Sequence, residues 1–311
     1  MSPQHGVLAG PDRADHCQAG DRPACDSPAA AMVEVADLTV PLVSVGVQRW
    51  RAGAIDEGLD WVCEERPVSL EYNGIAHAVM MATPQALEDF AVGFSLSEGI
   101  VAAAAEILEV EVGAQSRGLV VAVRLTARRA AVLKERRRTL AGRTGCGLCG
   151  VESLAHFDRA QASTSARQRF DAARLSAAMV QMARAQPLRE LTGATHAAAW
   201  LAADGTLAAL REDVGRHNAL DKTIGALARA DVDAAGGALL VTSRASYEMV
   251  QKAAGSGAGL LAAVSAPTAL AIRTAQELGL TLVGFARDGR HVVYTHAWRL
   301  HPGAAAVGDA A

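Results

Sequence analysis

Three short apolar runs near the end of the chain decide the fold: residues 238–242 (ALLVT), 260–264 (LLAAV) and 280–285 (LTLVGF). Between them, residues 246–254 and 267–278 have helical apolar spacing. Strands that alternate with short helices predict a βαβαβ unit, which is a parallel sheet with right-handed crossovers. The pair Asp288-Gly289 then predicts a turn that brings residues 291–295 back against the third strand.

The segments before these runs extend the same domain. Residues 195–201 read as a strand, Asp204-Gly205 as a turn into a second strand, and residues 216–227 as a helix. Helical spacing of Leu175, Ala178, Met179 and Met182 predicts a helix that packs on the core. We therefore expect residues 166–300 to form a three-layer α/β domain that binds the cofactor discussed below.

The sequence before this domain predicts an α+β portion over residues 45–165. Alternating apolar residues at Val68, Leu70 and Tyr72 lead to Asn73-Gly74, a strong hairpin signal. Thr83 is expected to cap a helix over 84–98, with Pro84 in its first turn. Residues 119–125 read as a strand, and the basic residues 128–138 as a helix with either a solvated face or a cationic role. Residues 1–44 and 301–311 are expected to be tails, the first disordered.

Composition excludes several classes of protein. The 311 residues carry 30 Lys and Arg against 33 Asp and Glu, and only 4% are aromatic. This near-balance argues against a nucleic-acid binder, which would need a basic surface. No apolar run approaches the roughly 18 residues of a membrane helix, and the N-terminus has no signal-peptide core. The sequence thus predicts a soluble, cytoplasmic protein without membrane contact.

The sharpest local feature is a CxxC motif, Cys146-Gly147-Leu148-Cys149, inside the glycine-rich segment 142–150. Two thiols at this spacing can bind a metal, form a redox disulfide or carry sulfur. A zinc site would need further ligands, for which His156, His196 and His217 are candidates. The flexible loop and the basic residues upstream favour a reactive thiolate. Cys63 reads as a packing residue, and Cys17 and Cys25 as bystanders in the tail.

Polar residues follow each of the three predicted parallel strands. These are Ser243, Arg244 and Ser246, then Ser265 and Thr268, then Arg287, Asp288 and Arg290 in the segment from Ala286 to Arg290. Ligands of open parallel sheets bind beyond the carboxyl ends of the strands. Hydroxyls, helix N-termini and arginines suit a phosphorylated ligand, although Ser246 and Thr268 would also serve as ordinary helix caps. There is no dinucleotide or P-loop fingerprint.

A third cluster of polar residues runs from Glu212 to Lys222 (EDVGRHNALDK). One interpretation of the cluster is structural, with Asp213 as a helix cap and His217 as a satisfied core histidine, and the other is ligand binding. Since a merely solvated helix does not need Arg, His and Asn in succession, we expect Arg216 and His217 to bind a ligand.

Taken together, these motifs resemble the formate dehydrogenase accessory sulfurtransferases, or FdhD-type proteins, over roughly residues 45–299. The resemblance rests on the CxxC motif, on residues 212–222, and on three C-terminal segments: 243–248 with Lys252-Ala253, 266–268, and 285–296. Two positions depart from the family pattern, since Ala194 stands where Gly is expected and Ala269 where Ser is common.

The resemblance implies a sulfur carrier with a cytidine-deaminase-like α/β domain. Cys146 would form the persulfide intermediate, with Cys149 assisting, in a sulfurtransferase reaction between a cysteine desulfurase and the formate dehydrogenase catalytic subunit. The substrate would be Mo-bis(molybdopterin guanine dinucleotide), with tungsten as the other possible metal. Residues expected to bind it are Ser243, Arg244, Thr268, Arg216, His217 and Phe285 to Arg290.

No structural metal is expected, and the apolar N-terminal sheet offers a surface for a homodimer. Two other functions stay open: a chaperone that binds the molybdenum cofactor without sulfur transfer, and a zinc-dependent nucleotide hydrolase. The deaminase reaction is disfavoured, because His196-Ala197-Ala198 lacks the glutamate of the H-x-E motif.

Overall fold

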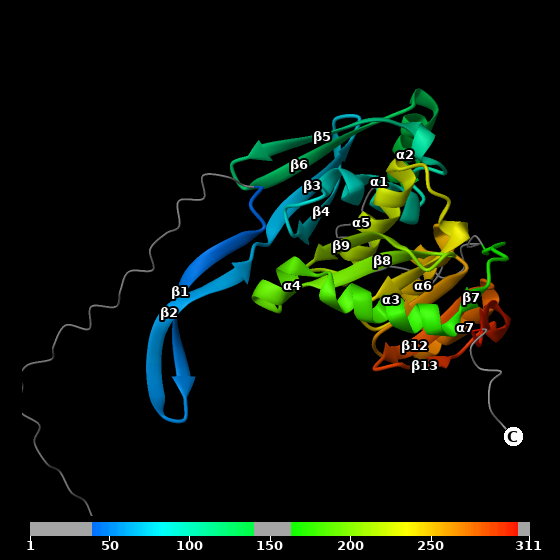
Figure 1. Cartoon of the computed structure of the whole chain (residues 1–311). Helices are drawn as coiled ribbons and strands as arrows, with labels where there is room; N and C mark the ends of the chain where they lie inside the picture. The colour runs from blue at the N-terminus through cyan, green and yellow to red at the C-terminus, as the bar shows by residue number, and fades with distance from the viewer. Residues whose placement is uncertain (1–38, 140–162, 304–311) are drawn as a thin grey trace, which may run out of the picture. The chain divides into compact units, whose positions relative to one another are not determined.

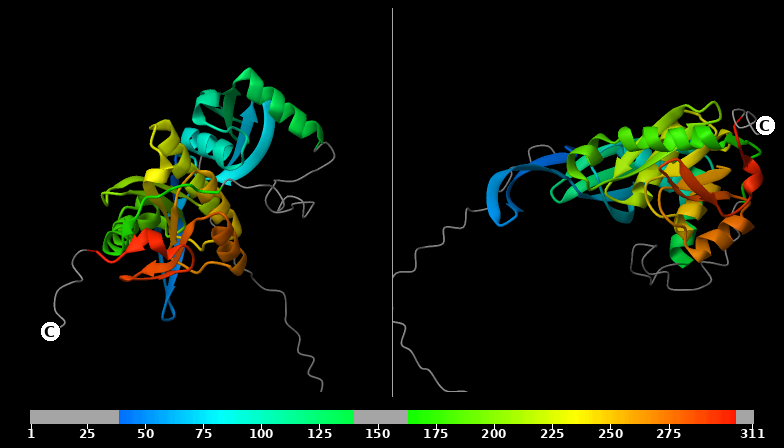
Figure 2. Two further views of the ribbon diagram at one scale, coloured as in Figure 1. Left: turned by 90° about the vertical axis from the view of Figure 1, so that its right-hand side faces the viewer. Right: turned by 60° about the horizontal axis from the view of Figure 1, so that its bottom comes forward.

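The computed structural model describes residues 39–139 and 163–303, which lie within one compact unit from Asp37 onward (Figure 1). Its first element is a long two-stranded hairpin of β1 (Leu42–Arg51) and β2 (Ala54–Cys63), blue in Figures 1 and 2. The strand begins at Leu42, inside the segment expected to be a tail. Among the described strands, β1 and β2 pair only with each other.

A four-stranded sheet follows, in the order β4-β3-β6-β5. The predicted turn at Asn73-Gly74 is confirmed, since it joins the antiparallel strands β3 and β4. Helix α1 buries Leu87, Phe90 and Phe94 against this sheet, where they form a core with Leu70 and Val121. The elements of this portion are β3 (Arg66–Tyr72), β4 (Ile75–Ala82), α1 (Leu87–Ser97), η1 (Ala104–Glu106), β5 (Ile107–Gln115), β6 (Gly118–Leu125) and α2 (Ala127–Thr139).

One boundary of this portion was predicted wrongly. Helix α1 begins at Leu87 rather than in the first turn after Thr83, and its N-cap is Ala86 in the left-handed conformation. The hydroxyl of Thr83 instead accepts a hydrogen bond from the backbone N–H of Val214 at 3.1 Å. A tertiary contact 131 residues away therefore takes the side chain that was expected to cap the helix.

The second sheet has six strands in the order β13-β12-β11-β10-β8-β9. The predicted βαβαβ unit is confirmed: β10, β11 and β12 are parallel neighbours, and β13 returns antiparallel to β12. Strands β8 and β9 form an antiparallel hairpin beside β10. The strands are β8 (His196–Ala202), β9 (Leu207–Asp213), β10 (Gly237–Val241), β11 (Leu260–Ala263), β12 (Thr281–Arg287) and β13 (Arg290–Val293).

Helices cover both faces of this sheet. Helices α5, α6 and α7 supply the core on one face, where Leu220, Met249 and Ala271 pack against the strands. Helix α3 covers the other face with the predicted residues Leu175, Ala178, Met179 and Met182. The helices are α3 (Ala172–Arg184), α4 (Pro187–Thr192), α5 (Arg216–Arg229), α6 (Tyr247–Gly255) and α7 (Ala269–Glu277), with short 3-10 turns at Ala234–Gly236 and Ala297–Arg299.

The chain closes with a short parallel pair, β7 (Phe170–Asp171) and β14 (Leu300–His301). Buried Arg299 donates to the carbonyl oxygens of Ala166 and Gly279, which ties these segments to the sheet. In the described part of the chain, no helix is both long and apolar enough to cross a membrane.

Candidate functional site

The loops after the three parallel strands lie side by side, as the sequence predicted. The N–H of Ser265 donates to the carbonyl of Ser243 at 3.4 Å, and the N–H of Phe285 donates to the carbonyl of Ser265 at 3.2 Å. A further bond joins Ala245 N–H to the carbonyl of Ala266. We call residues 242–246, 264–268 and 285–290 the strand-end loops.

Phe285 has an unusual backbone for a bulky residue. Its φ of 52° is left-handed, and it stands at an irregularity in the pairing of β12 with β13. Phe285 is 40% exposed, whereas the following Ala286 is buried. The preceding Gly284 leaves no space for a side chain, because a Cβ there would lie 2.8 Å from Pro267 Cδ. Strained backbone of this kind concentrates at functional sites.

The predicted turn at Asp288-Gly289 is confirmed, with both residues at positive φ (53° and 70°). This conformation is the one that a two-residue hairpin loop requires. Arg287 and Arg290 flank the turn as a cross-strand pair. Both arginines are exposed, so their guanidinium groups are available to a ligand.

A pocket of about 330 Å³ lies between this turn and helix α3. Its apolar lining comes from Leu175, Met179, Val180 and Ala183 of α3, together with Val264 and Ala286. The remaining lining residues are Gly289 and the polar residues Ser176, Arg184, Arg287, Asp288, Arg290 and His291. The sequence predicted α3 only as core. Its contribution to this pocket was missed, because it depends on which strand loop lies above the helix.

Most polar residues of the 212–222 cluster have structural partners. The buried carboxylate of Glu212 accepts hydrogen bonds from the N–H groups of Leu188 and Arg189, at the start of α4, and from the hydroxyl of Thr195. It thereby satisfies backbone donors that a helix start leaves free. Glu212 therefore fixes the start of α4, and its buried carboxylate has a structural role.

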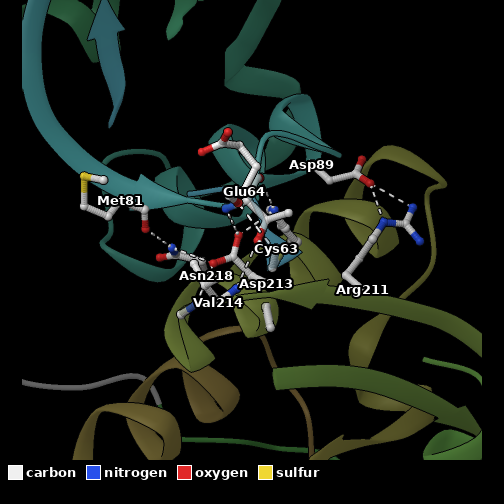
Figure 3. Close-up of polar contacts among 12 residues, drawn as sticks. Cys63, Glu64, Met81, Asp89, Arg211, Asp213, Val214 and Asn218 are labelled. Atoms are coloured by element: carbon white, nitrogen blue, oxygen red, sulfur yellow. Dashed lines mark hydrogen bonds and ion pairs between the residues drawn. The ribbon is translucent and has the colours of Figure 1, made fainter. Parts of the chain in front are cut away.

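Asp213 lies at the centre of a buried network (Figure 3). Its carboxylate pairs with the ammonium of Lys222 at 2.6 Å and accepts from the N–H groups of Thr83 and Gly215. Asn218 donates to it as well, at 3.1 Å. Asp213 was expected to cap a helix, but N-cap Gly215 gives α5 no side-chain cap. The carboxylate instead holds the β9–α5 loop against the end of β4.

Cys63 borders this network (Figure 3). Its sulfur lies 3.5 Å from the Thr83 hydroxyl, and the residue is half-buried, as the sequence predicted. Burial raises the pKa of the Cys63 thiol. A raised pKa lowers the thiolate fraction, so Cys63 is poorly suited to sulfur chemistry.

Lys252, one of the motif residues, is also structural. Its buried ammonium contacts the carboxylates of Asp221 and Glu98 and the hydroxyl of Ser97, all within 2.8–2.9 Å. These contacts join α6 to α5 and to the end of α1.

Arg216 and His217 remain from the 212–222 cluster, at the start of α5. His217 Nε2 lies 2.7 Å from Glu248 Oε2 on α6. Burial, with the charge of Arg216, lowers the pKa of His217 to about 4, so the ring is neutral at pH 7. Burial also lowers the pKa of nearby His196. Arg216 Nε, His196 Nδ1 and His217 Nε2 are three of the buried side-chain atoms that have no hydrogen-bond partner among the described residues, so the short His217–Glu248 contact is an ion-pair distance without hydrogen-bond geometry.

The other candidate residues have diverse surroundings. Thr268 is a helix cap, since its hydroxyl accepts from Ala271 N–H at 3.2 Å, whereas Ser246 occupies the N-cap of α6 without a side-chain hydrogen bond. Buried Ser243 donates to the carbonyl of Arg244, whose side chain is exposed. Cys146, Cys149, Cys17, Cys25 and His156 lie outside the described residues.

Comparison with known proteins gives a consistent result. The model of the FdhD/NarQ family matches residues 63–301. The chain is 56% identical over 254 residues to the "Sulfur carrier protein FdhD" of Cupriavidus necator, covering 82% of this chain and 88% of that protein. The protein of the same name from Bordetella petrii is 50% identical over 273 residues, with 88% and 96% covered.

A solved structure shares the fold. The crystal structure of a proposed formate dehydrogenase accessory protein from Desulfotalea psychrophila superposes with a TM-score of 0.68 at 22% identity, covering 84% of this chain and all of that one. Since the family model spans most of the chain and close relatives match nearly end to end, the chain belongs to the FdhD/NarQ family.

Proposed function

We propose that this chain is a cytoplasmic sulfurtransferase that takes sulfur from a cysteine desulfurase and delivers it to Mo-bis(molybdopterin guanine dinucleotide), for use by formate dehydrogenase. The observation that carries the proposal is the close kinship with relatives named sulfur carrier proteins, in a chain that holds a CxxC motif. The cytidine-deaminase likeness of the α/β domain, and a homodimer, belong to the same proposal.

The first step is a transfer between thiols. The Cys146 thiolate attacks the outer sulfur of the desulfurase persulfide, a new S–S bond forms on Cys146, and the desulfurase cysteine leaves as a thiolate. In the second step, the Cys149 thiolate attacks Cys146 Sγ and the outer sulfur leaves as sulfide toward the substrate. The resulting Cys146–Cys149 disulfide is then reduced by a cellular dithiol, which restores the carrier.

The strand-end loops support the binding half of the proposal. They gather Arg287 and Arg290, the exposed Phe285 and a pocket of ligand size at one edge of the sheet. Arg216 and His217 begin α5 of the same domain; Arg216 Nε is buried without a hydrogen-bond partner, whereas His217 Nε2 lies 2.7 Å from Glu248 Oε2. Arginines and helix N-termini are the groups that bind diphosphates, and the substrate carries guanosine diphosphate moieties.

Cys146→Ala tests the transfer step. We expect this variant to abolish activation of formate dehydrogenase in cells and to lose the persulfide that mass spectrometry detects on the CxxC peptide after incubation with a desulfurase and cysteine. The matched control is Cys63→Ala, which removes a thiol of raised pKa and should retain both signals. Normal activation by Cys146→Ala would contradict sulfur transfer and favour a chaperone that only binds the cofactor.

Arg287→Ala tests the binding step. Loss of a charge-assisted hydrogen bond should cost roughly 1.5 to 3 kcal/mol, which is about tenfold to a hundredfold in the Kd for GDP. Arg273→Ala, an exposed arginine on α7, is the control and should leave the Kd unchanged. Titration calorimetry of both variants measures the difference, and equal affinities would remove Arg287 from the site.

A further inference from the structure

Unsatisfied polar atoms gather where helices α5 and α6 begin. In the described part of the chain, six buried side-chain nitrogen or oxygen atoms have no hydrogen-bond partner. Four of the six belong to His196 at the start of β8, Arg216 and His217 at the start of α5, and Ser246 at the N-cap of α6. Folded proteins leave few buried donors unpaired, so their concentration in one region points to a ligand.

The sheet brings the two helix starts together. Strands β9 and β10 run parallel to each other, because both pair antiparallel with β8, so α5 and α6 begin at the same edge of the sheet. Neither N-cap, Gly215 or Ser246, gives its helix a side-chain hydrogen bond. The positive ends of two helices therefore lie near the Arg216 guanidinium, and this combination favours an anion.

This region is separate from the β12–β13 turn. In the sheet order, β8 stands three strands away from β12. Neighbouring strands lie about 4.8 Å apart, so the His196 end of β8 and the Phe285 end of β12 are separated by roughly 14 Å. An anion at Arg216 is therefore a different group from the one that Arg287 and Arg290 would bind.

Glu248 adds a carboxylate to the region. Its Oε2 lies 2.7 Å from His217 Nε2, and its side chain is 26% exposed. Burial and the charge of Arg216 lower the pKa of both His196 and His217, so both rings are neutral at pH 7 and do not neutralise the carboxylate. A carboxylate repels a fully ionised anion, whereas it accepts a hydrogen bond from an anion that carries a proton.

We propose that the starts of α5 and α6 bind a terminal phosphate group, free or in a monoester, through Arg216, His196 and Ser246, and that Glu248 selects it over sulfate. The inference goes beyond the proposed function, since this ligand need not be the molybdenum substrate. A guanidinium and backbone N–H groups suit the phosphate oxygens. A phosphate monoester loses its second proton with a pKa of about 6, so a carboxylate acceptor helps to keep that proton, whereas sulfate has none to offer at neutral pH.

Titration calorimetry at pH 7 with inorganic phosphate, glycerol 2-phosphate and sulfate tests the site. The wild type should bind phosphate or the monoester about tenfold or more tightly than sulfate, and Arg216→Gln should lose about tenfold or more of that affinity. Glu248→Gln, which replaces a carboxylate oxygen by an amide donor, should gain sulfate affinity and lose the preference. The matched control is Arg229→Gln, at the opposite end of α5, which should retain the wild-type values.

The two phosphate probes distinguish the sources of the ligand, because tighter binding of glycerol 2-phosphate than of inorganic phosphate would identify an ester. Equal affinities of the wild type for phosphate and sulfate would overturn the inference. Unchanged phosphate binding in Arg216→Gln, with folding verified by circular dichroism, would overturn it as well. GDP is the last probe: retained GDP binding by Arg216→Gln supports a separate site. Loss of GDP together with phosphate would assign this anion to the nucleotide, which overturns the separate site and leaves the proposed function standing.

Discussion

Lys222 and Asp213 form an ion pair in which both side chains are fully buried. Removing such charges from water costs several kcal/mol, which is tolerable only when hydrogen bonds satisfy the remaining donors and acceptors. Here the ammonium also donates to the carbonyl of Thr83 at 2.9 Å, and the carboxylate accepts from Thr83, Gly215 and Asn218. Most of the polar residues in the 212–222 cluster thus serve to fix loops.

Replacement of Lys222 by Met should therefore destabilise the protein strongly. It leaves the Asp213 carboxylate buried without its counter-charge, which costs roughly 3 to 5 kcal/mol. Denaturant unfolding followed by circular dichroism measures the loss. Arg124→Met breaks the exposed pair with Glu109 and should cost less than about 1 kcal/mol. Similar losses in the two variants would show that the buried Lys222–Asp213 pair contributes no more to the free energy of unfolding than the exposed pair does.

At the scale of elements, helices α1 and α5 cross with their backbones in direct contact. Gly93 of α1 and Gly225 of α5 face one another's helix backbones: a Cβ on Gly93 would collide with the carbonyl of Asp221, and one on Gly225 with the carbonyl of Asp89. Glycine inside a helix costs about 1 kcal/mol relative to alanine. The close crossing explains why glycine occurs at both positions, because the two helix backbones are in contact there.

Gly225→Ala should accordingly destabilise the protein, although alanine is the better helix former. The clash is with backbone, which cannot move aside cheaply, so we expect a loss of roughly 2 kcal/mol or more in the free energy of unfolding. The control is Gly255→Ala at the end of α6, where the added methyl group meets open space and stability should change by less than about 1 kcal/mol. An unchanged unfolding midpoint in Gly225→Ala would contradict the close crossing.

For the whole molecule, the β1–β2 hairpin is the most conspicuous exposed apolar surface. The register places Trp50, Ile55, Leu59 and Trp61 on one face, and Trp50 and Leu59 are 70% and 72% exposed. An isolated hairpin is marginally stable in water, and an apolar patch of this kind marks an interaction surface. We assign it to the homodimer proposed above, in which the same face of a second chain covers it.

The double variant Trp50→Lys, Leu59→Lys should be monomeric in analytical ultracentrifugation at micromolar concentration, whereas we expect the wild type to sediment as a dimer. The introduced charges repel each other across a two-fold axis, because an isologous interface presents each residue to its own copy or to its neighbours. Val79→Lys, at an exposed apolar position of β4, is the control and should sediment as the wild type does. A wild-type monomer would contradict the proposed interface.

The sequence determined the order of elements and the edge of the sheet at which the polar loops gather. Apolar spacing, the Asn73-Gly74 and Asp288-Gly289 turns and the handedness of crossovers are local signals, so the strands and helices of the last hundred residues were predicted closely. The family motifs were likewise visible in the sequence. These features need no knowledge of which distant segments meet.

Only the tertiary structure decided what individual polar residues do. Thr83 was expected to cap a helix, but its hydroxyl accepts from Val214 N–H and its own N–H donates to Asp213, because segments about 130 residues apart come together there. Tertiary contacts, which cannot be read from the sequence, therefore give most residues of the 212–222 cluster a structural role. Arg216 and His217 are the two that stay candidates for ligand binding. The position of helix α3 beside a pocket was also decided by tertiary packing. The sequence pattern of a helix shows which of its faces is apolar, whereas packing determines what that face contacts.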